Sequence, residues 1–412
     1  MQRGVVIALA LAAVAACGRT ELAKLDVPPE ETPADDNLWV ELGDSATAGG
    51  ISAHGGGASC IAVIVDTLGR VYVAWADDHA GSGQIYVRRF DGAWSSLQGS
   101  GDGGGISRGT AVVGGSTCPG GIDVDAADRV YVSWHQFNGI KQSVHLRVWD
   151  DASWSELGAS ATGDGISNGL VTNSWWPSVI VDESGTPWVS YTSASDAYVE
   201  RWTTSWAGVD GSDTAPGMTG VSNTAALIHV ARAPGGGGVA AAWTEQNGSL
   251  HVATSDGANW TALAGTVGTS ASSSSRPMIH SRGNALVVAW ADADDPVGRT
   301  QVARYEAGSW QRLPAATTAG GQQAAMALDT QGNPVIVWSN PGGATRQIRG
   351  VRWNGLAWSS IDGPSGNISD TSFDATWPGL ALTPEDDIVV LWLQSTGDGT
   401  AEIYGKLLSS GT

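Results

Sequence analysis

Short apolar runs alternate with polar turns along most of the chain. In "RVYVAW", from Arg70 to Trp75, apolar side chains recur at every second position, which is typical of a β-strand that packs on one face. Gly, Asp, Asn and Pro bound these runs, and no long amphipathic helix pattern occurs between them. The pattern therefore predicts an all-β protein.

The strands recur as a unit of roughly 50 residues. Each copy holds a Pro-x-apolar-x-apolar-Asp stretch, a Gly-bearing turn, two strands that end in aromatic residues, a tight turn and Trp-x-x-Leu. The second strands of the copies end on Trp75, Trp134, Tyr191, Trp243, Trp290, Trp338 and Trp392. Seven copies of four short strands predict a seven-bladed β-propeller of four-stranded blades over residues 37–412.

The ends of the chain are expected to complete one blade together. The seventh copy ends with "AEIYGKLL" and has no Trp-x-x-Leu stretch after it. The missing piece stands before the first copy, as "NLWVELG" at residues 37–43. We therefore expect the N-terminal strand to complete the last blade and close the ring, which would protect two sheet edges.

The repeat resembles those of bacterial propeller lipoproteins with Trp-rich repeats, and more distantly sialidase-like and kelch-like propellers. The resemblance covers residues 37–412 and implies a fold rather than an activity. Paired glycines before an aromatic, as in kelch repeats, are not regular here. In "TSDGANW" the Gly and Trp stand one position too early for the sialidase Asp-box.

The N-terminus reads as an export signal. Arg3 precedes an apolar run from Val5 to Ala16, which is too short to span a bilayer. The residues before and including Cys17 resemble the lipobox of bacterial lipoproteins, which implies a signal peptide over 1–16, cleavage before Cys17 and a lipid with palmitate-type chains on that residue. Gly18 in place of Asp implies the outer membrane. Residues 17–36 are acidic, contain Pro and are expected to form a tether.

Composition narrows the range of partners. The chain has 57 Gly, 20 Trp and only 3 Phe, which suits short strands joined by turns, and its net charge is −20. A strongly acidic chain argues against nucleic acid and against direct adhesion to anionic membranes, so membrane contact is expected through the lipid alone. We expect a monomer that binds a glycan or a protein.

Internal repetition separates scaffold from site. A residue type present in every blade serves the blade, whereas one found in a single blade is a site candidate. The Trp of Trp-x-x-apolar is scaffold by this test and is expected to wedge between blades: Trp39, Trp94, Trp154, Trp206, Trp260, Trp310 and Trp358. An Arg near the end of the third strand also recurs, as at Arg89, Arg147, Arg201, Arg304 and Arg352.

Loop lengths predict which face carries function. The turns from first to second and from third to fourth strands are tight, whereas the links from second to third strands and from blade to blade read as long and variable. Both variable classes leave an up-and-down blade on the same face, where binding is usually placed. At the channel mouth on this face we expect a site for a sugar, small anion or peptide formed by Trp176, Arg276, Gln323 and Trp377. Packed Trp side chains that only plug the channel are the alternative.

Two further groups stand near this face. Cys60 and Cys118 occupy matching positions in neighbouring blades and are expected to form a disulfide. Two acidic loops follow strand-end Trp residues and are weak calcium candidates through Asp77, Asp78, Asp292, Asp294 and Asp295. Neither loop matches the spacing of a known calcium loop, so a solvated acidic rim without a cofactor is the preferred interpretation.

Three functions remain open on the sequence alone. The first is an exported, lipid-anchored, non-catalytic propeller that binds a glycan or protein on its variable-loop face. The second is a divergent propeller glycoside hydrolase or polysaccharide lyase, which would need acids facing each other across the channel. The third is a structural envelope component. No His-x-x-x-His pair is present, and no Gly-x-Ser-x-Gly motif, phosphate-binding loop or dinucleotide fingerprint stands in a strand-to-helix context, which favours the first.

Overall fold

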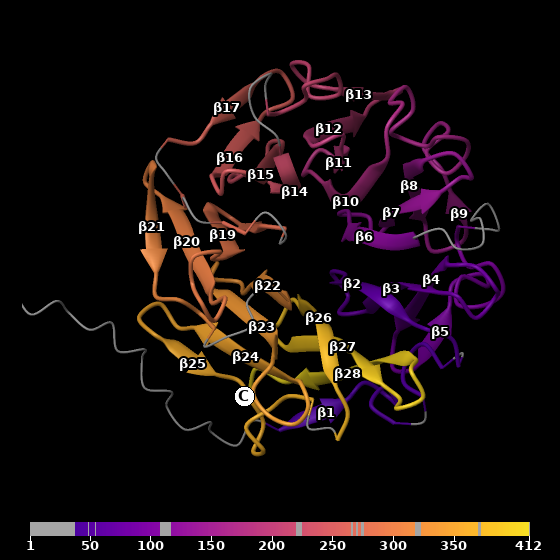
Figure 1. The fold of residues 1–412 in the computed structure, drawn as a ribbon, viewed down its shortest axis with the longest axis vertical. Coiled ribbons are helices and arrows are strands. Elements are labelled where there is room, and N and C mark those ends of the chain that lie inside the picture. Colours follow the sequence, from indigo (N-terminus) through magenta and orange to yellow (C-terminus); the bar gives the residue numbers. More distant parts are fainter. Residues whose placement is uncertain are drawn as a thin grey trace, which may run out of the picture. The chain divides into compact units, whose positions relative to one another are not determined.

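The computed structural model describes residues 38–47, 49–53, 55–107, 117–219, 225–264, 267–268, 271–272, 276–317, 323–369 and 372–411. These residues form seven four-stranded antiparallel sheets arranged as a ring (Figure 1). All of them belong to one compact unit, residues 31–412. The prediction of a seven-bladed β-propeller is confirmed. No helix in the described part of the chain has the length and apolar character needed to cross a membrane.

The first strand of each blade lies innermost, beside the axis of the ring (Figure 1). From blade 1 to blade 7 these inner strands are β2 (Ser59–Val65), β6 (Thr117–Val124), β10 (Ser174–Val181), β14 (Ala225–Arg232), β18 (Met278–Arg282), β22 (Ala324–Leu328) and β26 (Ala375–Leu382).

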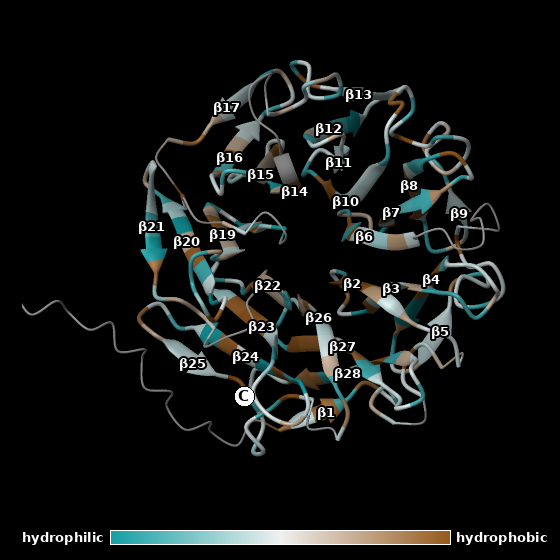
Figure 2. Ribbon diagram, viewed as in Figure 1, coloured by the Kyte–Doolittle hydropathy of each residue, from teal (hydrophilic) through white to brown (hydrophobic). Residues whose placement is uncertain are grey.

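The second strands hold most of the core. They are β3 (Val71–Asp77), β7 (Val130–Phe137), β11 (Pro187–Ser193), β15 (Val239–Glu245), β19 (Ala285–Ala291), β23 (Pro334–Asn340) and β27 (Ile388–Ser395). In β3, β11, β15 and β19 every residue is buried, because neighbouring blades cover both faces of the sheet. The seven aromatic residues predicted to end these strands are all buried. In Figure 2, β23 and β27 accordingly contain hydrophobic stretches.

The third strands are about as long as the second, and the fourth strands are shorter and more exposed. The third strands are β4 (Gln84–Phe90), β8 (Gln142–Trp149), β12 (Asp196–Trp202), β16 (Leu250–Ser255), β20 (Thr300–Glu306), β24 (Gln347–Trp353) and β28 (Ala401–Leu408). The fourth strands are β5 (Trp94–Ser96), β9 (Trp154–Ser155), β13 (Trp206–Gly208), β17 (Trp260–Ala262), β21 (Ser309–Leu313), β25 (Trp358–Ser360) and, in blade 7, β1 (Trp39–Glu41). In Figure 2, β21 is largely hydrophilic.

The N-terminal strand closes the ring as predicted. Blade 7 has the strand order β1-β28-β27-β26, with Trp39 opposite Leu408 and Glu41 opposite Lys406. The Trp39 Nε1 also donates to the Ile361 carbonyl of blade 6 at 2.8 Å. Strand β1 therefore covers the free edge of β28 and bonds to the preceding blade.

The wedge Trp residues join neighbouring blades. In six of the seven, the indole Nε1 donates to a backbone carbonyl of the preceding blade at 2.7 to 3.1 Å: Trp39, Trp94, Trp154, Trp206, Trp260 and Trp358. Their assignment as scaffold is thus confirmed. The seventh, Trp310 of blade 5, has a buried Nε1 without a hydrogen-bond partner.

The two faces of the ring differ in their links. We name the face with the turns from first to second and third to fourth strands the turn face, and the opposite one the variable-loop face. The expectation that second-to-third links are long is wrong for blade 3. Only Ala194 and Ser195 separate β11 from β12 there, and both have positive φ, as a two-residue hairpin turn requires.

Some blade-to-blade loops are themselves part of the scaffold. Ile51, Ile106 and Ile166 are buried, and each is followed by a Ser whose hydroxyl accepts the N–H of a third-strand residue. In blade 6, Ile368 and Ser369 repeat this arrangement. The tripeptide Gly-Ile-Ser or Asn-Ile-Ser marks these positions in the sequence. Because these residues pack against the blades, only the rest of each loop is available for binding.

Candidate functional site

The mouth of the channel on the variable-loop face is built from bulged inner strands. The register of β10 with β11 shifts between Trp175 and Ser178, and that of β26 with β27 shifts between Thr376 and Gly379. A bulge leaves a residue unpaired and re-aims its side chain. The residues inside these two bulges begin with the predicted site residues Trp176 and Trp377.

Both tryptophans have a backbone conformation that bulky residues rarely adopt. The φ angle is +54° at Trp176 and +50° at Trp377. Such a conformation costs energy for a residue with a large side chain and is found where a site requires it. The side chains are 43% and 54% exposed, whereas the strand-end tryptophans are buried. Cys60, in the equivalent bulge of blade 1, shares this conformation with a φ of +52°, so the bulge belongs to the repeat, and in blades 3 and 7 it presents an indole to solvent.

Trp176 rests on an aromatic support. Its ring and that of His135 meet edge to face, with 5.3 Å between centroids. Its backbone N–H donates to His135 Nδ1 at 3.4 Å, a long hydrogen bond. Burial lowers the pKa of His135 to about 3, so this imidazole stays neutral and acts as packing below Trp176.

Arg276 bonds to the residue that follows Trp176, and it is half-buried, with its guanidinium turned into the ring. Its Nη1 reaches across the inner ring from blade 5 and donates to the carbonyls of Gly120 in blade 2 and Pro177 in blade 3, each at 3.2 Å. Burial lowers its pKa to about 10, so the guanidinium remains charged at neutral pH. In the described residues no carboxylate pairs with it. Arg276 thus binds three blades together beneath the mouth.

The remaining predicted site residues lie at matching positions of other blades. Gln323 directly precedes β22 and is half-buried, and its Oε1 is enclosed without a hydrogen-bond partner. Trp377 occupies in blade 7 the position that Trp176 occupies in blade 3. The structure therefore joins Trp176 with Arg276 through Pro177, and it places Gln323 and Trp377 at other points of the ring.

The predicted disulfide is confirmed. Cys60 and Cys118 are bonded, with 5.6 Å between their Cα atoms, and they join the inner strands of blades 1 and 2. A further close contact follows between blades 2 and 3, where a Cβ on Gly120 would lie 2.0 Å from the Pro177 carbonyl oxygen. Only glycine fits there. Blades 1, 2 and 3 thus form a tightly connected arc of the mouth.

A cavity of about 590 Å³ follows the channel towards the turn face. Inner strands of all seven blades and the turns after them line it. His229 and His280 contribute rings whose centroids lie 5.7 Å apart, edge to face. Burial, with a smaller effect of the nearby Arg276 charge, lowers the pKa of His280 to about 4 and that of His229 well below its usual range. Both imidazoles are therefore neutral at physiological pH.

The Asp side chains along this cavity have structural partners. Asp123 accepts from Arg232 Nη2 at 2.7 Å and from the Val181 N–H at 2.7 Å, and burial raises its pKa despite that ion pair. The others are the turn residues Asp66, Asp125 and Asp182, whose carboxylates accept N–H groups of their own turns. This arrangement stabilises the blades and offers little support for the hydrolase or lyase interpretation.

The acidic loops also use their carboxylates locally. Asp77 Oδ1 accepts from the His79 N–H at 2.8 Å, and Asp78 Oδ1 accepts from the Gly57 N–H at 3.1 Å. In the other loop Asp292 Oδ1 accepts from the Asp294 N–H at 3.0 Å, while Asp295 pairs with Arg299 Nε at 2.5 Å. Within the described ranges, no group of three or more His, Cys, Asp or Glu side chains gathers as a metal site would require.

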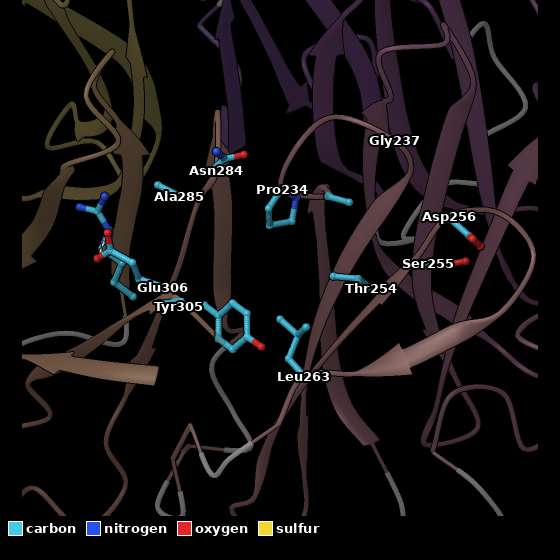
Figure 3. Close-up of a pocket in the computed structure, with 13 residues that line it drawn as sticks. Pro234, Gly237, Thr254, Ser255, Asp256, Leu263, Asn284, Ala285, Tyr305 and Glu306 are labelled. Carbon is cyan, nitrogen blue, oxygen red and sulfur yellow. Dashed lines mark ion pairs between the residues drawn. The ribbon is translucent and has the colours of Figure 1, made fainter. Parts of the chain in front are cut away.

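A second cavity, of about 480 Å³, lies between blades 4 and 5 on the turn face (Figure 3). We name it the blade 4–5 cleft; the residues that line it are Ala233, Pro234, Gly237, Thr254, Ser255, Asp256, Leu263, Asn284, Ala285, Arg304, Tyr305, Glu306 and Ala307. The sequence prediction, which placed function on the variable-loop face, did not include any of these residues. The sequence does contain a sign of this cleft: in blade 4, Thr254 and Ser255 stand where other third strands end in an Arg and an aromatic residue.

Comparisons with known proteins give distant structural matches only. No family model and no curated protein matches the sequence. A protein of unknown function from Dyadobacter fermentans superposes with a TM-score of 0.49 at 10% identity, covering 86% of this chain and 95% of its own. The fucose-specific lectin from Aleuria aurantia gives 0.47 at 17%, with 76% and 98% covered. The intramolecular trans-sialidase from Ruminococcus gnavus gives 0.44 at 11%, with 86% and 94% covered. At these identities the likeness concerns the propeller fold alone.

The predicted signal peptide over 1–16, the lipidated Cys17 and the tether over 17–36 lie outside the described residues.

Proposed function

We propose that this protein is an exported, lipid-anchored, non-catalytic propeller that binds a glycan at the channel mouth of its variable-loop face. The observation that carries the proposal is the pair of exposed tryptophans, Trp176 and Trp377, each held at positive φ inside a bulge. A flat indole face suits the apolar face of a sugar ring.

The surroundings of the two tryptophans support this proposal. The disulfide and Arg276 hold the inner strands of blades 1 to 3 in place, so the Trp176 indole is presented by a rigid frame and little ordering entropy is lost on binding there. The net charge of −20 favours a neutral glycan over an acidic one.

The test is glycan-array binding by the full chain, compared with the variants Trp176→Ala and Trp377→Ala. Loss of an aromatic contact of this kind is expected to weaken binding by about tenfold or more. Leu356→Ala is the matched control, because Leu356 is 89% exposed in the β24–β25 turn on the opposite face. Unchanged glycan binding by both Trp variants would rule out the mouth as the site.

The anchoring part of the proposal rests on the sequence of residues 14–17 and needs its own experiment. Metabolic labelling with palmitate, followed by fractionation of the envelope, should find the label on the chain in the outer membrane. Cys17→Ser should abolish the label and release the protein from the membrane fraction. Labelling that persists in Cys17→Ser would contradict the proposed anchor.

A further inference from the structure

The interface between blades 4 and 5 departs from the repeat in three ways, and the first concerns the third strands. An Arg followed by an aromatic ends this strand in four blades, as Arg89–Phe90, Arg201–Trp202, Arg304–Tyr305 and Arg352–Trp353. In blade 4 the two positions hold Thr254 and Ser255. Ser255 stands opposite the wedge residue Trp260, where every other blade has a large side chain. The volume of two large side chains is therefore absent.

The second departure is in the turns. Between blades 1 and 2, the Thr67 hydroxyl donates to Asp128 at 2.8 Å, and between blades 6 and 7 the Thr330 hydroxyl donates to Asp386 at 2.6 Å. Blade 4 instead has a glycine-rich turn, and its contact with the turn of blade 5 is a backbone hydrogen bond from the Gly235 N–H to the Gly283 carbonyl at 3.1 Å. The Thr–Asp hydrogen bonds of these two interfaces have no counterpart among the described residues of blades 4 and 5. Blades 3 and 4 are likewise joined by a backbone hydrogen bond, from the Glu183 N–H to the Gly236 carbonyl at 3.4 Å.

The third departure is at the wedge. Trp310 is the one wedge Trp of the seven whose buried Nε1 donates to no acceptor, although the other six bond to the preceding blade. Its ring packs against Tyr305 with 5.0 Å between centroids. The two walls of the blade 4–5 cleft are thus not drawn together, and the cleft stays open.

The cleft combines apolar surface with hydrogen-bonding groups. In the view of Figure 3 the Tyr305 ring and Leu263 lie next to one another, and Pro234 lies farther off, on the side of Asn284. Thr254 and Asn284 add a hydroxyl and an amide to the rim.

The charged groups of the cleft are one cation and two carboxylates. Arg304 Nε lies 3.8 Å from Glu306 Oε2, and Asp256 accepts the Ala258 N–H of its own turn at 2.9 Å. An excess of one negative charge disfavours an anionic ligand.

We propose that the blade 4–5 cleft is a second binding site, for a neutral, hydroxyl-rich ligand of the size of a mono- or disaccharide. The apolar face of such a ligand packs on Tyr305 and Leu263, and its hydroxyls bond to Thr254, Asn284 and Asp256. The volume of about 480 Å³ lies within the range of small-molecule sites. This site is on the opposite face from Trp176 and Trp377 and does not depend on them.

The test is isothermal titration of the full chain with methyl pyranosides of glucose, galactose, mannose and fucose. We expect saturable binding of at least one, retained in the Trp176→Ala/Trp377→Ala variant. Restoring the repeat by Thr254→Arg with Ser255→Trp fills the cleft and should weaken this binding by about tenfold or more. Ser95→Arg, on the exposed outer strand of blade 1, adds the same charge elsewhere and should leave it unchanged.

Two smaller substitutions test the site even if the variant with Thr254→Arg and Ser255→Trp does not fold. Thr254→Val and Asn284→Ala remove one hydroxyl and one amide, and together they should weaken binding by about tenfold. Circular dichroism and the melting temperature report whether each variant is folded. Absence of binding across the four pyranosides, or unchanged affinity in folded cleft variants, would overturn the second site. A loss seen only in the Trp variants would place the sugar at the mouth instead.

Discussion

Some residues of this propeller lower the free energy of unfolding, and they do so for different physical reasons. Trp176 and Trp377 are exposed and have positive φ, and the proposed glycan binding would make use of their exposure. Glu200 is buried in blade 3, where Tyr191 donates its hydroxyl hydrogen to Oε1 at 2.6 Å. Burial raises the pKa of Glu200 to about 7, which makes this carboxyl a sensor of pH inside the sheet.

Replacing Glu200 by Gln should therefore change the pH dependence of stability. The pKa of Glu200 is about 7 in the folded protein and near its ordinary value when unfolded, so its stabilising effect is complete below about pH 4.5 and is lost as the pH rises through 7. Relative to the natural protein, Glu200→Gln should gain about 3 kcal/mol between pH 4.5 and 8. Urea unfolding across this range measures the difference.

Glu306→Gln provides the comparison for that experiment, because Glu306 is exposed. At one fixed pH its unfolding free energy should stay within about 0.5 kcal/mol of that of the natural protein, as is usual for a substitution at the surface. Parallel pH profiles for Glu200→Gln and the natural protein would show that the buried carboxyl is not linked to folding.

Among the elements, the inner strands decide how firmly the mouth is held. Strands β2 and β6 are joined by the disulfide, and β6 and β10 are in contact through Gly120. Blades 4 and 5 lack such connections on the turn face, where the second cavity opens. The ring is thus rigid on one arc and open on another, and the two proposed sites correspond to these two regions.

Removing the disulfide should lower the stability of the whole ring. The Cys60–Cys118 bond closes a loop with a sequence separation of 58, which corresponds to roughly 4 kcal/mol in the chain-entropy view. Cys60→Ser with Cys118→Ser should lose stability of this order in chemical unfolding. The natural protein after reduction should behave in the same way, and equal stability of all three forms would contradict a stabilising role.

The sequence predicted the elements better than the site. Blade count, closure and the disulfide followed from repetition, because each blade must bury the same strand-end aromatic and wedge Trp. Repetition could not show that Arg276 turns inwards to two carbonyls, since that depends on distances between blades. The repeat did contain a sign of the blade 4–5 cleft, because Thr254 and Ser255 replace the Arg and aromatic residue that end other third strands. Only the structure shows that no neighbouring side chain fills the volume that they leave.

At the scale of the whole molecule, closure by β1 is the feature that holds the ring. Trp39 and Leu408 come from opposite ends of the chain and stand opposite each other in one sheet. A chain truncated to begin at residue 44 should expose the edge of β28, melt at a lower temperature and associate through that edge. Size-exclusion chromatography and thermal unfolding measure both effects. A chain that begins at residue 37 keeps β1 and should stay monomeric, and equal behaviour of the two truncations would contradict the role of β1.

The same pairing also sets an order of events in time. During synthesis β1 emerges first and β28 last, so the partner of the first strand does not exist until the chain is almost complete. Blade 7 cannot form early, and its two edges stay unpaired while the other six blades assemble. Completion of the ring is therefore a late step, which waits for the last strand of the chain to be made.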